Sequence, residues 1–197
     1  NHNKTKNSFI TGEYTSTYMY HPGVPKRIFN LLPKIKLIVI LRNPIDKAYS
    51  TYYQQFNFGE YTTSFEETIN TEFRRIALNK DFSELNSNNP DFENFVVHNI
   101  IRHGIYADYL EHWLEIFNRK QILILNSDDL KKFTKETLCR VFNFLNISNC
   151  DITNTSQVNV GKYPPMNKST RKKLIEFYKP HNQRLNKLLG TNFNWDN

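Results

Sequence analysis

The chain has 197 residues, with 26 Lys and Arg against 19 Asp and Glu and a net charge of +7. This length predicts one domain that can bury a hydrophobic core, and no apolar run approaches the ~20 residues that a membrane-spanning helix needs. The two cysteines, Cys139 and Cys150, are too few for a disulfide framework and lack metal-ligand spacing. The positive charge suits an anionic ligand, but it suits nucleic acid equally and does not choose between them.

The first expected elements precede a central apolar run. Residues 8–13 predict a short strand, because residues 9–11 are apolar or β-branched. Residues 24–32 predict a helix with its apolar side chains on one face, and Pro33 is expected to end it.

The central run predicts a strand, a tight turn and a helix. Leu37 to Leu41 is continuously apolar and partly β-branched, which favours a strand buried on both faces. Pro44 suits the first position of a helix, and Asn43 can cap it. The turn would direct free backbone N–H groups and the positive end of the helix dipole to a point beside Arg42. This arrangement suits an anion, most simply a phosphate.

Arg42 and Ser50 are the candidate phosphate ligands at this turn. Ser50 lies eight residues after Arg42, about two helical turns up the new helix. A guanidinium fork and a hydroxyl could therefore bind one phosphate. The alternative is that Arg42 pairs with a carboxylate while Ser50 faces water, and the residues alone leave both open.

The second half of the chain alternates helices with one more strand. Ser64 with Glu67 forms a capping box for a helix that runs to about Leu78, after a turn at residues 57–61 and before a polar loop at residues 79–94. Later elements are expected at residues 105–117 (helix), 121–125 (buried strand), 134–145 (helix) and 169–189 (helix, broken at Pro180 and stopped at Gly190).

A second candidate ligand segment lies in the loop at residues 157–166. Gly161 and Lys162 can offer backbone N–H and an ammonium group to phosphate, while the Tyr163 ring could stack on a base. The alternative is a surface loop that leads into the last helix.

The sequence Arg-Asn-Pro-x-Asp-Lys-Ala-Tyr-Ser-x-Tyr, residues 42–52, resembles the 3′-phosphate motif of sulfotransferases that use 3′-phosphoadenosine 5′-phosphosulfate (PAPS), most closely the heparan-sulfate and bacterial branch. The resemblance spans about residues 12–195 and implies that Arg42 and Ser50 hold the 3′-phosphate. Gly161, Lys162 and Tyr163 resemble the family loop ending in Tyr-Pro-x-Met, which closes over the same phosphate. Relatives often brace this loop with a disulfide, for which Cys150 has no partner here.

The segment from residue 12 to residue 18 resembles the family's Gly-Glu-x-Ser/Thr-Pro-x-Tyr segment, which lines the acceptor side. This implies substrate contacts by Tyr14 and Tyr18, although many relatives have Lys at position 14 and Pro at position 16. An aromatic loop that packs on the core is the alternative. No catalytic residue is assigned, and three of the six histidines, His98, His103 and His112, show no metal-ligand spacing with Cys or acidic residues.

The strand and helix order predicts an α/β fold, and the resemblance implies a P-loop-NTPase-like three-layer fold with a central parallel sheet flanked by helices. We expect one sulfotransferase domain at residues 1–197. No Gly-rich Lys-Ser/Thr motif occurs in the sequence. The family's first strand, its phosphosulfate loop and its catalytic base are therefore expected upstream of this chain, which would be inactive alone.

The implied reaction moves a sulfuryl group from PAPS to a hydroxyl or amine of a carbohydrate or small molecule and releases 3′-phosphoadenosine 5′-phosphate (PAP), without a metal or nucleic acid. The compartment would be the cytoplasm for a bacterial protein and the Golgi lumen for a heparan-sulfate type enzyme. One alternative is a kinase-like enzyme of related fold, which needs a Gly-Lys-Ser/Thr loop and a carboxylate for Mg²⁺. The other is a non-enzymatic basic anion-binding module, although Lys and Arg are scattered here rather than gathered on one helix face.

Overall fold

The computed structural model describes residues 10–78, 99–148 and 161–195. Its sheet contains two parallel strands, β1 (Leu37–Leu41) and β2 (Ile122–Asn126), paired from Leu37 with Ile122 to Leu41 with Asn126. A parallel pair needs a long crossover connection, and here the helices between the two strands supply it.

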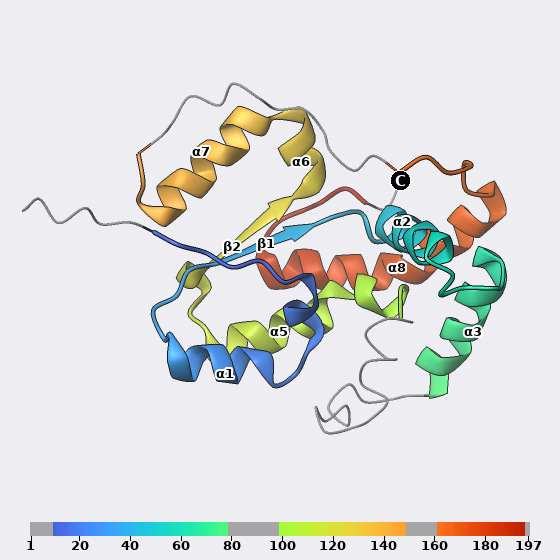
Figure 1. Cartoon of the computed structure of the whole chain (residues 1–197), viewed down its shortest axis with the longest axis horizontal. Helices are drawn as coiled ribbons and strands as arrows, with labels where there is room; N and C mark the ends of the chain where they lie inside the picture. Colours follow the sequence, from blue (N-terminus) through green and yellow to red (C-terminus); the bar gives the residue numbers. More distant parts are fainter. Residues whose placement is uncertain (1–9, 79–98, 149–160, 196–197) are drawn as a thin grey trace, which may run out of the picture.

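Helices lie on both sides of this sheet. The helices α1 (Val24–Leu31), α5 (Tyr106–Ile116) and α8 (Lys168–Leu189) lie on one side, and α6 (Ser127–Lys132) and α7 (Thr134–Leu145) lie on the other (Figure 1). At one end of the sheet stand α2 (Pro44–Asn57) and α3 (Phe65–Leu78) (Figure 1). Short 3₁₀ turns are η1 (Ser16–Tyr20), η3 (Arg102–Gly104) and η4 (Arg119–Gln121). The predicted α/β class, with helices flanking a parallel sheet, is confirmed.

Two predictions about strands are wrong. Residues 10–15 form neither helix nor strand, and Ile10 is exposed, so no sheet edge pairs with this segment. In β1, Ile38 and Ile40 remain 39% and 52% exposed, so the strand is not buried on both faces. The apolar run lies in a sheet that has two strands in the described part of the chain, and its core-facing residues alone pack against helices.

The last helix is continuous, contrary to the predicted break at Pro180. Proline removes one helical N–H donor and crowds the preceding turn, yet α8 runs through it from Lys168 to Leu189. Tyr178 precedes Pro180 in the helix and Leu185 follows it, and both side chains are buried in the hydrophobic core. Tertiary packing of this helix against α5 therefore outweighs the local defect. Its stop at Gly190, which has φ +64°, is confirmed.

Local signals elsewhere are confirmed. Asn43 caps α2 by accepting a hydrogen bond from the Ile45 N–H at 2.9 Å. Ser64 and Glu67 form the expected reciprocal capping box at the start of α3. The predicted helices at 105–117 and 134–145 match α5 and α7 closely. The polar loop at 79–94, His98 and residues 157–160 lie outside the described residues.

Candidate functional site

The strand–turn–helix at Arg42 forms as the sequence predicts. Arg42 follows β1 directly, and α2 begins two residues later with Pro44 at its first position. The Tyr106 hydroxyl on α5 donates to the Arg42 carbonyl at 2.8 Å, which fixes the backbone at this corner. The Arg42 side chain is half-buried, and no hydrogen bond or ion pair joins its guanidinium to a described residue. The carboxylate partner considered for Arg42 is therefore not found in the described part of the chain.

One face of α2 carries Asp46, Tyr49, Ser50 and Tyr53. Residues at i, i+3, i+4 and i+7 lie on the same side of a helix. Ser50 is half-buried there, and its hydroxyl has no hydrogen-bond partner among the described residues. Ser50 therefore lies on the same side of α2 as the segments that contact Asp46, Tyr49 and Tyr53.

The loop at 161–166 packs against this same face. The Tyr163 ring stacks on Tyr53 with centroids 5.1 Å apart at 9°, and it meets Tyr49 edge-on at 5.4 Å. The Tyr49 hydroxyl donates to the Pro164 carbonyl at 3.1 Å. In the structure Tyr163 thus stacks on protein, and its first role is to dock the loop beside Ser50.

Gly161 is needed for this docked geometry. A Cβ atom added at Gly161 would lie 2.6 Å from Cε1 of Tyr163, closer than real carbon atoms approach. The ring is held by two tyrosines of α2, so it has little room to move away. Between the two residues, the Lys162 side chain is exposed, without a hydrogen bond or ion pair to a described residue.

The start of α8 fixes the other end of the loop. Arg171 forms an ion pair with Asp46 of α2 at 2.8 Å, and the Thr170 hydroxyl donates to Glu66 of α3 at 2.9 Å. Asn167 caps α8 by accepting from the Ser169 N–H. The loop that carries Lys162 is consequently held against α2 at both ends, although this ion pair, half-exposed, is worth little by itself.

The residues predicted to contact substrate lie in a different environment. Tyr14 is 89% exposed, and Tyr18 is 38% exposed with its hydroxyl donating to Glu13 at 2.6 Å. That hydrogen bond to a carboxylate raises the pKa of the Tyr18 phenol. In the described part of the chain, neither ring packs on another aromatic ring. Tyr14 therefore does not pack on the core, contrary to the alternative of an aromatic loop packed there.

Comparison with known proteins places these motifs in one family. A family model described as the sulfotransferase domain matches residues 9–196, almost the whole chain. The chain belongs to the sulfotransferase domain family. Carbohydrate sulfotransferase 15 of Mus musculus is 31% identical over 80% of this chain and 30% of its own length. Heparan sulfate glucosamine 3-O-sulfotransferase 6 of Homo sapiens is 24% identical over 98% of this chain and 58% of its own length.

A solved structure supports the fold of this sulfotransferase domain. The crystal structure of a sulfotransferase from Alicyclobacillus acidocaldarius matches with a TM-score of 0.72 at 23% identity, over 93% of this chain and 66% of that one. A further relative, the membrane-associated sulfotransferase kil1 of Dictyostelium discoideum, is 23% identical over 98% of this chain and 54% of its own length. The domain thus spans between 30% and 66% of the length of these four proteins. Among its described helices, none has the length and apolarity to cross a membrane.

The sulfotransferase domain contains a buried ionisable group that sequence reasoning missed. Glu72 of α3 is almost fully buried and accepts the backbone N–H groups of Ile100 and Ile101 at 2.9 and 2.7 Å. Burial raises the pKa of Glu72 to about 7, against the opposing effect of those N–H donors. The sequence signal was weak, because Glu72 lies in an ordinary amphipathic helix.

A second ionisable side chain, that of Lys47 in the 42–52 motif, lies against η1. Its ammonium lies 5.2 Å from the centre of the Tyr20 ring, and Tyr20 stacks on buried His103 at 4.0 Å. Burial lowers the pKa of Lys47 to about 8, partly offset by Glu72, and lowers that of His103. Lys47 therefore joins α2 to Tyr20 at the end of η1.

The His112 side chain bonds to protein groups through both ring nitrogens. His112 contacts the Pro22 carbonyl through Nε2 at 2.9 Å and Glu115 through Nδ1 at 3.4 Å. Cys139 is a free thiol. In the ranges 10–78, 99–148 and 161–195, no group of three metal-ligating side chains comes together.

Proposed function

We propose that the protein carrying this domain transfers a sulfuryl group from PAPS to a hydroxyl or amine of a carbohydrate and releases PAP. Within it, Arg42, Ser50 and the loop residues Gly161, Lys162 and Tyr163 hold the 3′-phosphate of the nucleotide. Tyr14 and Tyr18 stand on the acceptor side. Family membership favours this proposal over the kinase-like and non-enzymatic alternatives.

The observation that carries the proposal is the docking of the loop on the α2 face that bears Ser50. Tyr163 stacks on Tyr53, and Arg171 pairs with Asp46, so the loop and the motif helix form one packed unit. Arg42, which directly precedes this unit in the chain, and Lys162, within its loop, have no hydrogen bond or ion pair to a described residue. Two cations and a hydroxyl without partners in the described part of the chain suit a doubly charged phosphate monoester.

The chemistry assigned to these residues is positioning. PAPS supplies the sulfuryl group; the acceptor oxygen or nitrogen attacks sulfur, and the bond from sulfur to the 5′-phosphate oxygen breaks. Arg42 and Lys162 bind charge at the 3′-phosphate, which is remote from that bond. They therefore orient the donor rather than stabilise the transferred group.

The direct test of function uses the full-length protein with labelled PAPS and a panel of saccharide, phenol and amine acceptors. We expect labelled product together with one PAP released per transfer, and strongly reduced transfer in Arg42→Ala. The matched control is Arg74→Ala, which removes an exposed arginine from α3. No transfer to any acceptor by a protein that binds PAP would contradict the proposed reaction while leaving the nucleotide site intact.

We also expect residues 1–197 alone to give no measurable transfer. The sequence lacks a Gly-rich loop that could surround the 5′-phosphosulfate. Loss of a single donor aimed at the reacting group typically costs about a hundredfold or more. Comparable turnover by the 197-residue form and the full-length protein would contradict this expectation.

A further inference from the structure

Lys47 of α2 is a half-buried cation whose charge the fold does not use for a hydrogen bond or ion pair with a described residue. Its ammonium faces the Tyr20 ring instead, with the ring centre 5.2 Å away. Burial lowers the pKa of Lys47 to about 8, and Glu72 favours the charged form. Removing an ammonium group from water costs free energy unless hydrogen bonds replace the lost hydration. An uncharged side chain of similar length would therefore serve the stability of the fold at least as well.

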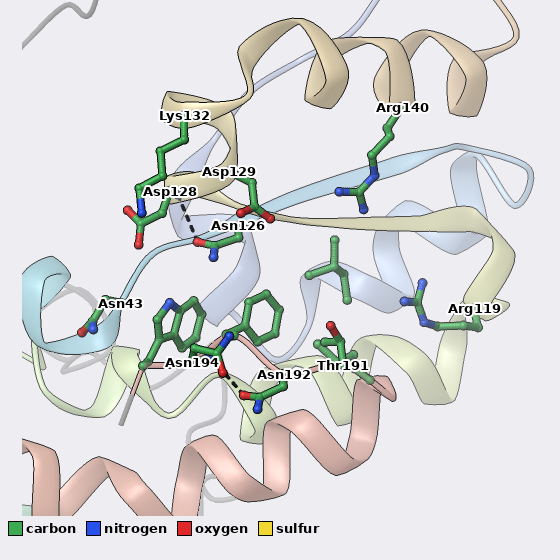
Figure 2. Close-up of a pocket in the computed structure, with 14 residues that line it drawn as sticks. Asn43, Arg119, Asn126, Asp128, Asp129, Lys132, Arg140, Thr191, Asn192 and Asn194 are labelled. Atoms are coloured by element: carbon green, nitrogen blue, oxygen red, sulfur yellow. Dashed lines mark hydrogen bonds between the residues drawn. The ribbon is translucent and has the colours of Figure 1, made fainter. Parts of the chain in front are cut away.

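The first turns of α2 face two different places. Asn43, which caps the helix, lines a polar cavity of about 420 Å³ that Arg119, Arg140 and Trp195 also line (Figure 2). Lys47 lies one helical turn further on, with its N–H bonded to the Asn43 carbonyl at 2.9 Å, and it is not among the residues that line this cavity. The Lys47 ammonium therefore belongs to the contact between α2 and η1.

The Tyr20 ring at the end of η1 is held by three elements. It stacks on buried His103 of η3 at 4.0 Å and meets Tyr109 of α5 edge-on at 5.0 Å. Lys47 supplies a third contact, from the helix that also carries Ser50. A cation over an aromatic face is attracted by the ring quadrupole, and more strongly when both groups are partly desolvated. The charge of Lys47 therefore fastens η1 to the motif helix.

The residues before Tyr20 have few contacts of this kind. Tyr14 is 89% exposed, and the Tyr18 hydroxyl bonds within its own segment. The indole N–H of Trp113 donates to the Met19 carbonyl at 3.2 Å, again at the end of η1. Because Tyr18 precedes Tyr20 by only two residues, the place where the Tyr20 ring is held decides how far the segment can extend.

We propose that Lys47 is a positioning residue, which holds η1 through the Tyr20 ring and so places the segment that bears Tyr14 and Tyr18 before the acceptor binds. The inference rests on the proposed function, because that proposal assigns the segment to the acceptor side. Lys47 itself contacts neither donor nor acceptor. Without its charge the segment populates other arrangements, and the apparent affinity for the acceptor falls with the fraction of molecules that keep the segment in place.

The test measures steady-state transfer by the full-length protein from labelled PAPS to an unsulfated hexasaccharide of glucuronic acid and N-acetylglucosamine. Lys47→Met keeps an unbranched side chain without the charge, whereas Lys47→Arg restores a cation. We expect Lys47→Met to raise the acceptor KM roughly three- to tenfold, as for loss of a partly desolvated cation–π contact, with little change in kcat. Lys47→Arg should restore the KM. The control Lys26→Met removes an exposed lysine from α1 and should match the wild type.

A second readout needs no acceptor. The N–H groups of Tyr18 and His21 bond to the carbonyls of Thr15 and Tyr18, at 3.3 and 3.4 Å. Amide hydrogen exchange reports local opening of such bonds. In Lys47→Met both amides should exchange faster than in the wild type, while urea unfolding should show a free energy of unfolding no lower than that of the wild type.

An unchanged acceptor KM in Lys47→Met, or a fall in kcat alone, would overturn the proposal. Parallel losses of unfolding free energy and PAP affinity in that variant would overturn it too, because they would make Lys47 a structural residue. Absence of transfer by the wild type to every acceptor would instead refute the proposed function. In that case unchanged exchange at Tyr18 and His21 would still refute the positioning role, and faster exchange would support the contact of Lys47 with η1.

Discussion

The loop at 161–166 and the segment at 10–18 were both predicted to contact ligand, yet the protein holds them very differently. The loop packs through Tyr163 on Tyr49 and Tyr53 and is fixed beyond its end by Arg171 and Asp46. The segment exposes Tyr14 and is assigned neither helix nor strand before η1. The loop proposed to bind the nucleotide is therefore packed on α2, whereas the segment proposed to face the acceptor leaves the Tyr14 side chain in solvent.

This contrast has a functional consequence. A site whose groups are already placed loses little conformational freedom when a ligand binds. The proposed nucleotide would be the same in every turnover, so a fixed site suits it. The segment proposed to face the acceptor is fixed mainly where Tyr20 meets His103 and Lys47, so it can adjust to a partner.

The largest expected effect comes from Arg42→Ala. Loss of a charged hydrogen-bonding partner should weaken PAP binding by roughly 1.5–3 kcal/mol, while 5′-AMP, which lacks the 3′-phosphate, should bind as before. Calorimetry on the full-length protein measures both, with Arg74→Ala as the matched control. Unchanged PAP affinity in a folded Arg42→Ala protein would contradict the assignment.

Tyr163→Ala should undock the loop. The ring is partly buried in an aromatic cluster, so its loss should lower the free energy of unfolding by roughly 1–3 kcal/mol and weaken PAP binding as well. Tyr163→Phe keeps the ring and should retain nearly all of both. Urea unfolding and calorimetry report the two quantities. Equal behaviour of the two variants would show that ring stacking does not hold the loop.

These two variants mark what the sequence could predict. Local signals sufficed for the Asn43 cap, the Ser64–Glu67 capping box and the start of α2, because they depend on residues within one turn. The contact of Tyr163 with Tyr53 joins positions 110 residues apart, and no local pattern specifies it. The strand, turn and helix around Arg42 were predictable, but the aromatic packing of Tyr163 on this helix was not.

The failures have the same origin. An apolar run such as Leu37–Leu41 predicts that a strand forms, but the neighbouring elements decide which of its faces are buried. Pro180 predicted a break from a local rule that the packing of α8 on α5 overrides. The cavity next to Asn43 combines Arg119, Arg140 and Trp195 from three distant segments, so it could not be foreseen.

Glu72 should make the stability of the fold depend on pH, because its carboxylate is buried against the backbone of Ile100 and Ile101. Its pKa is raised to about 7 in the folded protein, so the folded state holds a proton that the unfolded state has released above about 4.3. The contribution of Glu72 to stability is therefore complete at low pH and is lost as the pH rises through 7. The free energy of unfolding should fall by roughly 1–3 kcal/mol across that window.

The check is urea unfolding at pH 5, 6 and 7 for the wild type and Glu72→Gln. Glutamine does not titrate, so the free energy of unfolding of the variant should depend less on pH between pH 5 and 7. Glu67→Gln is a control from the same helix, since Glu67 is exposed and its pKa is lowered by its bonds to Ser64. Parallel pH profiles for the wild type and Glu72→Gln would show that Glu72 does not titrate in this range.

The smallest expected effect is that of Tyr14→Ala. An exposed ring without described ring contacts contributes little to folding, so the free energy of unfolding should change by less than about 0.5 kcal/mol. PAP affinity should also stay the same, whereas acceptor turnover should fall if Tyr14 contacts substrate. Thermal unfolding, calorimetry and the transfer assay separate these three readouts. A change in PAP affinity would place Tyr14 on the nucleotide side.

The central claim is that Arg42, Ser50 and Lys162 converge on a 3′-phosphate. The most direct measurement compares PAP with 5′-AMP by calorimetry in the wild-type full-length protein and in Ser50→Ala and Lys162→Ala. The account predicts that PAP binds more tightly than 5′-AMP, that Ser50→Ala reduces this preference, and that Lys162→Ala reduces it further because a charge is lost. Equal affinities for PAP and 5′-AMP in the wild-type protein would contradict the assignment of all three residues.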